Sequence, residues 1–345
     1  MKKQITIYDI AEKLNYSTST ISRALRDHHS ISKKTATLIK KEAEIMGYRP
    51  NTLAAGLRKN RTKTIGVLIS RINRPFMSSL ISGIEDQAKK AGYTVIIIQC
   101  NDDYESEVRN AKTLYDMRIS GIISSLSMQT SDYDHFKPFL NRIPLVFVDR
   151  VPECLPSYKV IIDNYASAYK ATSHLIDQGC LRIAHFAGSQ LRSIYKDRRK
   201  GYEDALKNAG LKVDEELIIE MKTLSSKEGK KATEYLMKMK NPPDGLFTSN
   251  DTVAISAIQS IKKMGLNVPY DLAIIGFNND PVASIIEPSL SSISHPASKM
   301  GELSAKCILD NFDSVENGGQ LDQTTILDTQ LIIRKSSSRK ITIQH

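Results

Sequence analysis

STSTISRALR, residues 17–26, lies at the centre of the stretch that decides the fold, Thr6–Leu57. Small polar side chains lie on one side of this helical segment and apolar side chains on the other. A first amphipathic segment, Thr6–Leu14, precedes it after a turn of only two residues. Two short helices joined by a tight turn are typical of a helix-turn-helix, whose second helix enters the DNA major groove.

Each helical segment of this N-terminal region has a core-facing stripe. Thr6 can cap the first helix, with Asp9 three residues on in a capping-box pattern. A third segment, Ser32–Met46, ends before Gly47, where a glycine typically terminates a helix. The apolar residues that recur at helical spacing are Ile7, Ile10, Ala11, Leu14, Ile21, Ala24, Leu25, Ile39, Ala43 and Met46.

The opposite face of the second helix suits DNA. Ser17 is the expected cap, and the free N–H groups behind it suit a phosphate. The short side chains of Thr18, Ser19 and Ser22 allow close approach to base edges. Arg23 can form a bidentate contact with guanine, the commonest specific pairing in the major groove. A three-helix module that binds protein instead of DNA is the alternative.

The positive charge is concentrated at the N-terminus. The whole chain has a formal charge of +10. Residues 1–63 contain nine Lys and five Arg against five acidic residues, a net charge of +9, which leaves +1 for the other 282 residues. A basic unit joined to a near-neutral body indicates a nucleic-acid-binding headpiece more than a merely solvated surface.

The segment PNTLAAGLRKNRTK, residues 50–63, links this unit to the body. Asn51 can cap a helix of roughly two turns, which is too short to be stable alone in water. Ala54 permits close approach to another surface, and Leu57 is an apolar residue among basic ones. From these residues alone, a basic flexible tether is the preferred interpretation. The alternative is a helix that forms against a second copy of itself in the DNA minor groove, with Leu57 wedged between base steps.

The run from Thr6 to Ile69 resembles the lactose-repressor (LacI/GalR) family. It contains a T-[IL]-x-D-[IV]-A start, an S-x-x-T-[IV]-S-R recognition helix, a G-Y-x-P-N link and a hinge-helix leucine. The resemblance implies base reading by Thr18, Ser19 and Arg23, phosphate binding by Ser17 and Thr20, and minor-groove contacts by Ala54 and Leu57. The complete expected DNA-binding set is Thr6, Ser17, Thr18, Ser19, Thr20, Ser22, Arg23, Asn51, Ala54 and Leu57.

The body shows short β-branched runs separated by amphipathic helical stretches. These runs cover residues 65–70, 94–99, 121–126, 144–149, 159–164, 182–188, 217–221, 244–250 and 272–278. Alternating strands and helices predict an α/β fold with parallel sheets. About 280 residues exceed what one sheet usually holds, so we expect two similar lobes. The predicted domains are a helix-turn-helix headpiece (1–50), a hinge helix and linker (51–63) and a two-lobed effector-binding and dimerisation domain (64–345).

Polar side chains follow several of these expected strands. Because parallel strands direct their carboxyl ends to one crevice, such residues are candidate ligand contacts. Paired hydrogen bonds from Asp, Asn and Arg suit the hydroxyls of a sugar, and an aromatic ring suits its apolar face. Helix caps and loop residues are the alternative, strongest for Asp251. The effector-binding candidates are Phe76, Asp149, Asp163, Arg198, Asn250 and Asn278.

The body also resembles the effector domain of the LacI/GalR family, which is built like a periplasmic sugar-binding protein. The resemblance implies effector contacts at Phe76, Asp149, Arg198, Asn250 and Asn278. Asn278 stands where the family usually has aspartate, and His295 where it usually has glutamine. It also implies lobe crossings near residues 163, 292 and 323, with an N-lobe of residues 64–162 and about 292–322.

The sequence lacks the signals that identify several other classes of protein. No run of 18 apolar residues and no secretory signal occurs, so we expect a cytoplasmic protein without a membrane span. The four cysteines are scattered, and neither CxxC nor HExxH occurs, so no metal is expected. The absence of GxGxxG, GxxxxGK[ST] and GxSxG motifs predicts no nucleotide cofactor and no enzymatic activity.

These observations predict a sequence-specific transcriptional regulator, with repression as the expected role. The partners would be a second copy of the chain, a near-palindromic double-stranded DNA operator, and a small-molecule effector between the lobes. A sugar or sugar derivative is the expected effector class. The alternatives are a DNA-tethered sugar-modifying enzyme, which turnover would reveal, and a solute-binding protein, which secretion would reveal.

Overall fold

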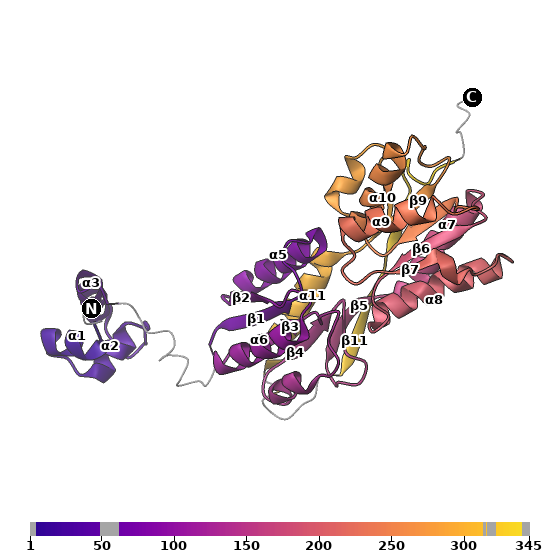
Figure 1. Ribbon diagram of the computed structural model, residues 1–345. Coiled ribbons are helices and arrows are strands. Elements are labelled where there is room, and N and C mark those ends of the chain that lie inside the picture. The colour runs from indigo at the N-terminus through magenta and orange to yellow at the C-terminus, as the bar shows by residue number, and fades with distance from the viewer. Residues whose placement is uncertain (1–4, 49–61, 313–314, 316–321, 340–345) are drawn as a thin grey trace. The chain divides into compact units, whose positions relative to one another are not determined.

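The protein is described from a computed structural model that covers residues 5–48, 62–312, 315 and 322–339. The chain divides into two compact units, Met1–Thr62 and Lys63–His345. Figure 1 shows the first as a small all-helical unit and the second as an α/β body of two lobes.

The N-terminal unit is a three-helix headpiece. Its helices are α1 (Ile7–Leu14), α2 (Thr18–Ala24) and α3 (Lys33–Ile45). The expected stripes meet in one apolar cluster, with Ile10, Ile21 and Ile39 fully buried. Gly47 follows α3 with a φ of +71°, the left-handed conformation expected of a terminating glycine.

The body alternates strands and helices along its whole length. Its strands are β1 (Thr64–Ile69), β2 (Thr94–Gln99), β3 (Gly121–Ser124), β4 (Leu145–Val148), β5 (Tyr158–Ile162), β6 (Ile183–Ala187), β7 (Ile218–Glu220), β8 (Gly245–Thr248), β9 (Ala273–Asn278), β10 (Ser291–Ser294), β11 (Gln323–Leu327) and β12 (Gln330–Ile332). Its α-helices are α5 (Pro75–Lys90), α6 (Tyr104–Asp116), α7 (Asn164–Asp177), α8 (Ser193–Asn208), α9 (Ser226–Leu236), α10 (Asp251–Lys263) and α11 (Ala297–Asp310). Short 3-10 helices are η1 (Asp134–Phe139), η2 (Glu215–Leu217) and η3 (Pro281–Ser284).

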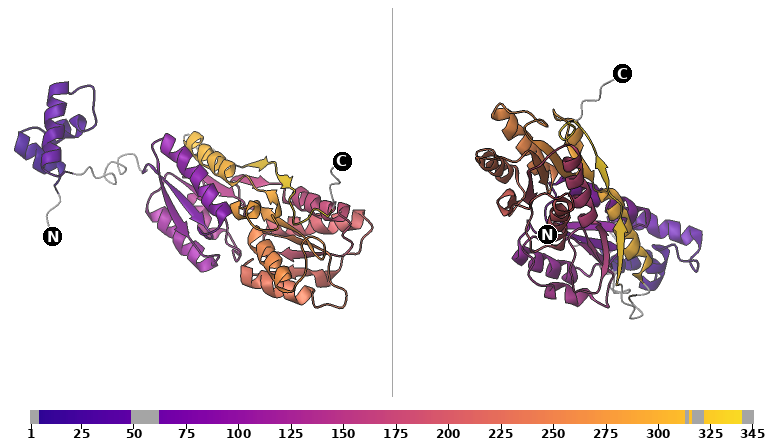
Figure 2. Two further views of the ribbon diagram at one scale, coloured as in Figure 1. Left: turned by 90° about the horizontal axis from the view of Figure 1, so that it is seen from above. Right: turned by 90° about the vertical axis from the view of Figure 1, so that its right-hand side faces the viewer.

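The strands form two six-stranded sheets, one in each lobe. The N-lobe sheet has the order β11-β5-β4-β3-β1-β2, and all of its pairings are parallel. The C-lobe sheet has the order β12-β10-β9-β8-β6-β7, and only the β10–β12 pairing is antiparallel. The two views of Figure 2 show helices on both sides of the sheets. The predicted α/β fold with two parallel-sheet lobes is confirmed.

Successive strand residues face different apolar clusters, as both-side coverage requires. In β1, Ile65, Val67 and Ile69 belong to the cluster under α5 and α11, while Leu68 belongs to the cluster under α6. The first cluster continues into the C-lobe, where it includes Phe277. One apolar core therefore spans the junction of the lobes.

The chain passes three times between the lobes. The first crossing follows β5, at the expected residue 163, and the second follows β10. The third differs from the expected position near residue 323, because residues 323–327 form β11 in the N-lobe sheet. That crossing therefore lies at residues 328–329, and the N-lobe extends to Leu327.

The nine strands expected from β-branched runs are all present. Strands β10, β11 and β12 were not expected as strands, because their Ser, Thr and Gln residues give no continuous apolar signal. Within the described part of the chain, no helix is both long and apolar enough to cross a membrane.

Glycines allow the helices of each lobe to cross at backbone contact. A Cβ on Gly83 of α5 would lie 2.1 Å from the backbone oxygen of Ser298. A Cβ on Gly301 of α11 would lie 2.1 Å from the backbone oxygen of Leu80. In the C-lobe, a Cβ on Gly201 of α8 would lie 2.3 Å from the backbone oxygen of Tyr165. Only glycine permits these distances.

We predict that Gly83→Ala lowers the free energy of unfolding by about 1–3 kcal/mol, since the added methyl group must push α5 and α11 apart. Urea unfolding followed by circular dichroism measures the effect. Ser82→Ala, at an exposed position of the same helix, is the matched control and should change stability by less than about 0.5 kcal/mol. Equal midpoints for the two variants would contradict the tight crossing.

Candidate DNA-binding face and effector cleft

Ser17 caps the N-terminus of α2. The backbone N–H of Thr20 donates to Ser17 Oγ at 3.1 Å, as expected for a cap. The Ser17 hydroxyl also lies 2.8 Å from Ser19 Oγ and 2.8 Å from Thr20 Oγ1. The turn before it contains Asn15 with a φ of +54°, which lets α1 end and α2 begin within three residues.

The polar face of α2 is open to a partner. Ser19 and Arg23 are exposed, and the other three expected contacts on the helix, Thr18, Thr20 and Ser22, are half-buried. Thr6 is exposed at the start of α1, where its backbone N–H donates to Asp9 Oδ2 at 2.7 Å. The expected contacts Asn51, Ala54 and Leu57 lie outside the described residues.

A cleft between the lobes lies at the carboxyl ends of the strands. Its space totals about 630 Å³, including the part open to solvent. The cleft brings together five of the six expected effector contacts: Phe76, Asp149, Arg198, Asn250 and Asn278. The sixth, Asp163, is exposed and does not line this cleft. Its Oδ1 accepts the backbone N–H of Ala166 at 2.8 Å, which makes it the cap of α7.

Arg198 of α8 is buried, with only 3% of its surface exposed. Its Nε donates to Asn164 Oδ1 at 2.8 Å, and its Nη1 donates to the Ser249 carbonyl at 2.9 Å. The guanidinium lies 3.6 Å from the centre of the Phe277 ring, which adds a cation–π contact. Burial lowers the pKa of Arg198 from its ordinary value. This side chain is thus a fixed donor in the cleft.

Asp149 follows β4 with a φ of +62°, a left-handed conformation that is uncommon for residues other than glycine. Only 7% of Asp149 is exposed. Burial raises the pKa of its carboxyl, against the opposing effect of Arg150 and Arg198. The residue combines backbone strain with a poorly solvated carboxyl, and both features are concentrated at functional sites in proteins.

The two expected asparagines differ in how their side chains are used. Asn250 is the cap of α10, because its Oδ1 accepts the Val253 N–H at 2.8 Å while its Nδ2 donates to the Leu224 carbonyl at 3.1 Å. The cap was expected at Asp251, which instead accepts hydrogen bonds from Ser292 and the Asp280 backbone inside the core. Asn278 ends β9 with a φ of +109°.

Phe76 packs against an imidazole in the cleft. The ring centres of Phe76 and His295 lie 4.2 Å apart. His295 Nδ1 lies 3.4 Å from Asn278 Oδ1, and burial lowers the pKa of the imidazole well below its ordinary value. His295 Nε2 is buried and has no hydrogen-bond partner within the described structure. A neutral imidazole with one free nitrogen is suited to a hydrogen bond with a ligand.

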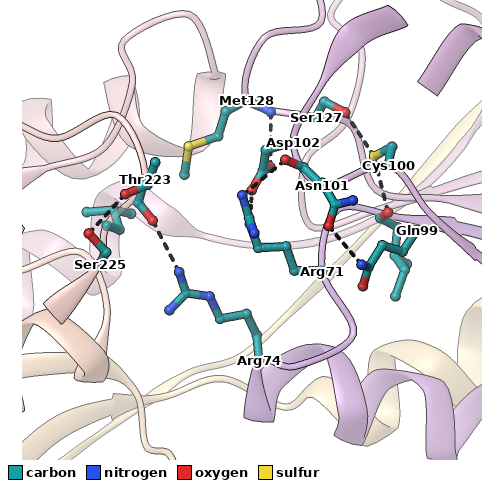
Figure 3. A network of polar contacts seen from close by, with 12 residues as sticks. Arg71, Arg74, Gln99, Cys100, Asn101, Asp102, Ser127, Met128, Thr223 and Ser225 are labelled. Carbon is teal, nitrogen blue, oxygen red and sulfur yellow. Dashed lines mark hydrogen bonds and ion pairs between the residues drawn. The ribbon is translucent and has the colours of Figure 1, made fainter. Parts of the chain in front are cut away.

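A polar network from the N-lobe forms the other side of the cleft, as Figure 3 shows. Arg71 Nε donates to Asp102 Oδ2 at 3.2 Å, and the Met128 backbone N–H donates to Asp102 Oδ1 at 3.3 Å. Burial alone would raise the pKa of Asp102, but the charge and hydrogen bond of Arg150 outweigh it and hold this pKa below its ordinary value. Arg74, directly before α5, points away from this network toward Thr223 (Figure 3).

Similar proteins are regulators of transcription. A family profile described as "Bacterial regulatory proteins, lacI family" matches residues 6–51, and one described as "Periplasmic binding protein-like domain" matches residues 172–337. The HTH-type transcriptional repressor CytR of Escherichia coli K12 is 32% identical over 335 residues, which cover 96% of this chain and 96% of CytR. The chain belongs to the LacI family. Among other relatives, the NTD biosynthesis operon regulator NtdR of Bacillus subtilis 168 is 30% identical and matches 96% of this chain and 99% of NtdR.

This LacI-family member is a transcriptional regulator with a helix-turn-helix and an effector-binding domain, as its sequence predicted. Solved structures share its fold. The lac repressor dimer bound to operator and the anti-inducer ONPF superposes with a TM-score of 0.83, at 23% identity, over 97% of this chain and 99% of that one. The CelR–cellobiose complex superposes with a TM-score of 0.70, at 24% identity, over 96% of this chain and 100% of that one.

Several residues in or beside the cleft of this LacI-family member were not expected from its sequence. Asn164, the residue after Asp163, accepts a hydrogen bond from Arg198 and so positions it. Asn164 and Asp163 look alike in the sequence, and only the buried contact with Arg198 sets Asn164 apart. Arg74 precedes the expected Phe76 in the same N-R-P-F run, but a loop arginine gives no signal of its direction. His295 was noted only as a departure from the family pattern. Within the described residues, no group of His, Cys, Asp and Glu is arranged to hold a metal ion.

We predict that Ser17→Ala destabilises α2 by about 1 kcal/mol, because the Thr20 amide loses its cap acceptor. Amide hydrogen exchange in the full-length protein should accelerate about fivefold across α2. Ser17→Asp keeps an acceptor, so exchange should stay slow, while its negative charge should weaken DNA binding. Ser22→Ala is the matched control on the same helix. Unchanged exchange in Ser17→Ala would show that this cap does not stabilise the helix.

Proposed function

We propose that this protein is a homodimeric repressor that binds a near-palindromic operator and responds to a small molecule in the cleft. The observation that carries the proposal is the pairing of an open polar face on α2 with a buried, polar-lined cleft at the strand ends of the body. Effector binding would alter DNA affinity through a coupling free energy between the two sites.

The DNA half of the proposal rests on α2. Thr18, Ser19, Ser22 and Arg23 would read base edges, since Arg is suited to guanine and hydroxyl groups to several bases. Thr6, Ser17 and Thr20 would bind phosphates. The linking segment 51–63 would supply Asn51, Ala54 and Leu57 to the minor groove, in keeping with its sequence. The lac repressor dimer, which shares this fold and is bound to operator, supports this half by analogy.

The effector half rests on the cleft. Arg198, Asp149 and Asn278 supply a fixed donor, an acceptor and an amide within one polar-lined space, as the hydroxyls of a sugar or sugar derivative require. Phe76 and His295 supply ring faces beside them. The complex of CelR with cellobiose, which also shares this fold, supports a sugar-like ligand by analogy.

The proposal includes a cytoplasmic location, where the operator would be, and regulation without enzymatic activity. The relatives of this protein, CytR and NtdR, are transcription regulators, which supports this part of the proposal. The competing function is a DNA-tethered enzyme that modifies a sugar. The two are distinguished by incubating the protein with a ligand that it binds and then measuring product: the proposal requires that the ligand be recovered unchanged.

We predict that Arg23→Gln lowers operator affinity by about 1–3 kcal/mol and relaxes specificity at one base pair of each half-site, because a bidentate guanine contact is lost. Operators are first selected from random DNA, and affinity is then measured for specific and unrelated duplexes at fixed salt. Any loss of affinity in the comparison variant Lys34→Gln should be equal for the specific and the unrelated duplex. Retained base preference in Arg23→Gln would contradict its role in base reading.

For the effector, we predict that a thermal-shift screen of sugars and sugar derivatives identifies a ligand that raises Tm, because binding to the folded state stabilises it by mass action. Asn278→Ala should reduce that shift, and the exposed Asn241→Ala should leave it intact. The same ligand should change operator affinity. A ligand shift that survives in Asn278→Ala would remove this residue from the proposed site.

A further inference from the structure

The cleft contains more arginine than its carboxylates neutralise within ion-pair distance. Arg71, Arg74, Arg150 and Arg198 all line it. Arg71 Nε lies 3.2 Å from the carboxylate of Asp102, and Arg150 Nη1 lies 2.5 Å from the same carboxylate. One carboxylate is therefore shared by two guanidinium groups and neutralises only one of their two charges, so one positive charge remains in this part of the cleft (Figure 3 shows Arg71 and Asp102).

The other two arginines are held by neutral acceptors. Arg74 Nη1 donates to Thr252 Oγ1 at 3.3 Å, and its Nη2 donates to the Thr223 carbonyl at 3.2 Å. Arg198 likewise donates to an amide oxygen and a carbonyl. Among the ion pairs closer than 4.0 Å in the described residues, none involves Arg74 or Arg198. Neither guanidinium group therefore has a described carboxylate within ion-pair distance, although both line the cleft.

The remaining negative charges of the cleft are weak counter-charges. Besides Asp102, only Asp149 and Asp280 are acidic among the lining residues. Burial raises the pKa of both, that of Asp280 to about 6, against the opposing charge of Arg74. Four arginines against three aspartates give a lining charge of +1 when every carboxylate is ionised. His295 adds no charge because burial keeps it neutral.

We propose that the effector carries an anionic group, a phosphate or a carboxylate, and that Arg74 binds it in the cleft. A charged acceptor forms stronger hydrogen bonds with a guanidinium than the hydroxyl and carbonyl that Arg74 now contacts. Helix α5 begins directly after Arg74, so the positive end of its dipole adds to the attraction. The inference rests on the proposed function of the cleft as the effector site and specifies the class of ligand.

Such a ligand would also act on the junction of the lobes. Arg74 belongs to the N-lobe, whereas Thr223 and Thr252 belong to the C-lobe. An anion that takes the Arg74 donors removes these two hydrogen bonds and replaces them with contacts through the ligand. The anionic group is thus the part of the effector that changes how one lobe is bonded to the other.

The test is calorimetric titration of the full-length protein with inorganic phosphate, at an ionic strength held constant with potassium chloride. We expect Arg74→Gln to weaken phosphate binding at least about tenfold, equivalent to about 1.4 kcal/mol, and Arg74→Lys to retain most of it. Lys240→Gln, which removes an exposed cation of the body outside the cleft, should bind phosphate like the unaltered protein. Thermal unfolding of each variant verifies that it is folded.

Three results would overturn the inference: no phosphate binding above that of chloride, equal affinity in Arg74→Gln, or loss of binding in Lys240→Gln instead. Competition with glucose 6-phosphate, gluconate and glucose then identifies the source of the charge. Stronger displacement of phosphate by glucose 6-phosphate would assign a phosphate ester, and stronger displacement by gluconate a carboxylate. Equal displacement by neutral glucose would reject the anionic ligand while leaving the proposed effector cleft intact.

Discussion

The direction of the strands is the constraint on which the rest of this structure depends. Parallel strands release the chain at one edge of a sheet, and here both sheets release it into the same cleft. The residues at these exits, including Asp149, Asn250 and Asn278, are therefore drawn from segments far apart in the sequence. The backbone strain at two of these three exits, with φ of +62° and +109°, is concentrated at the same edge.

Polar groups at this edge link the two lobes. Arg74 extends from the N-lobe to Thr252 in the C-lobe, and Arg192 extends from the C-lobe to the carbonyl of Thr130 in the N-lobe. Each hydrogen bond joins a charged group to a neutral one; the Arg74 bond is part-buried and the Arg192 bond is buried, where an unmade bond is costly. In the proposed mechanism, a molecule in the cleft replaces some of these bonds, and this exchange transmits occupancy to the lobe arrangement.

The sequence was informative wherever a local signal was present. Apolar spacing located α1, α2 and α3 with their core residues, and β-branched runs located nine strands. Five of six expected effector contacts share one cleft. The effector contact that lies outside the cleft has a physical explanation, because helix caps and ligand contacts use the same residue types. Asp163 caps α7, while its neighbour Asn164 accepts a hydrogen bond from Arg198. The short polar strands β10 to β12 are defined by their pairing partners, which no local pattern reveals.

The glycine crossings have a mechanical consequence. Because α5 touches α11 backbone to backbone at Gly83 and Gly301, and α8 meets α7 in the same way at Gly201, neither pair can slide without a collision. Each lobe is therefore stiff. The backbone joins the two lobes at three segments, near residues 163, 295 and 328, so any rotation of one lobe against the other has to bend all three. Because the three connections must bend together and each lobe moves as one body, a change at the cleft would displace an entire lobe instead of a single loop.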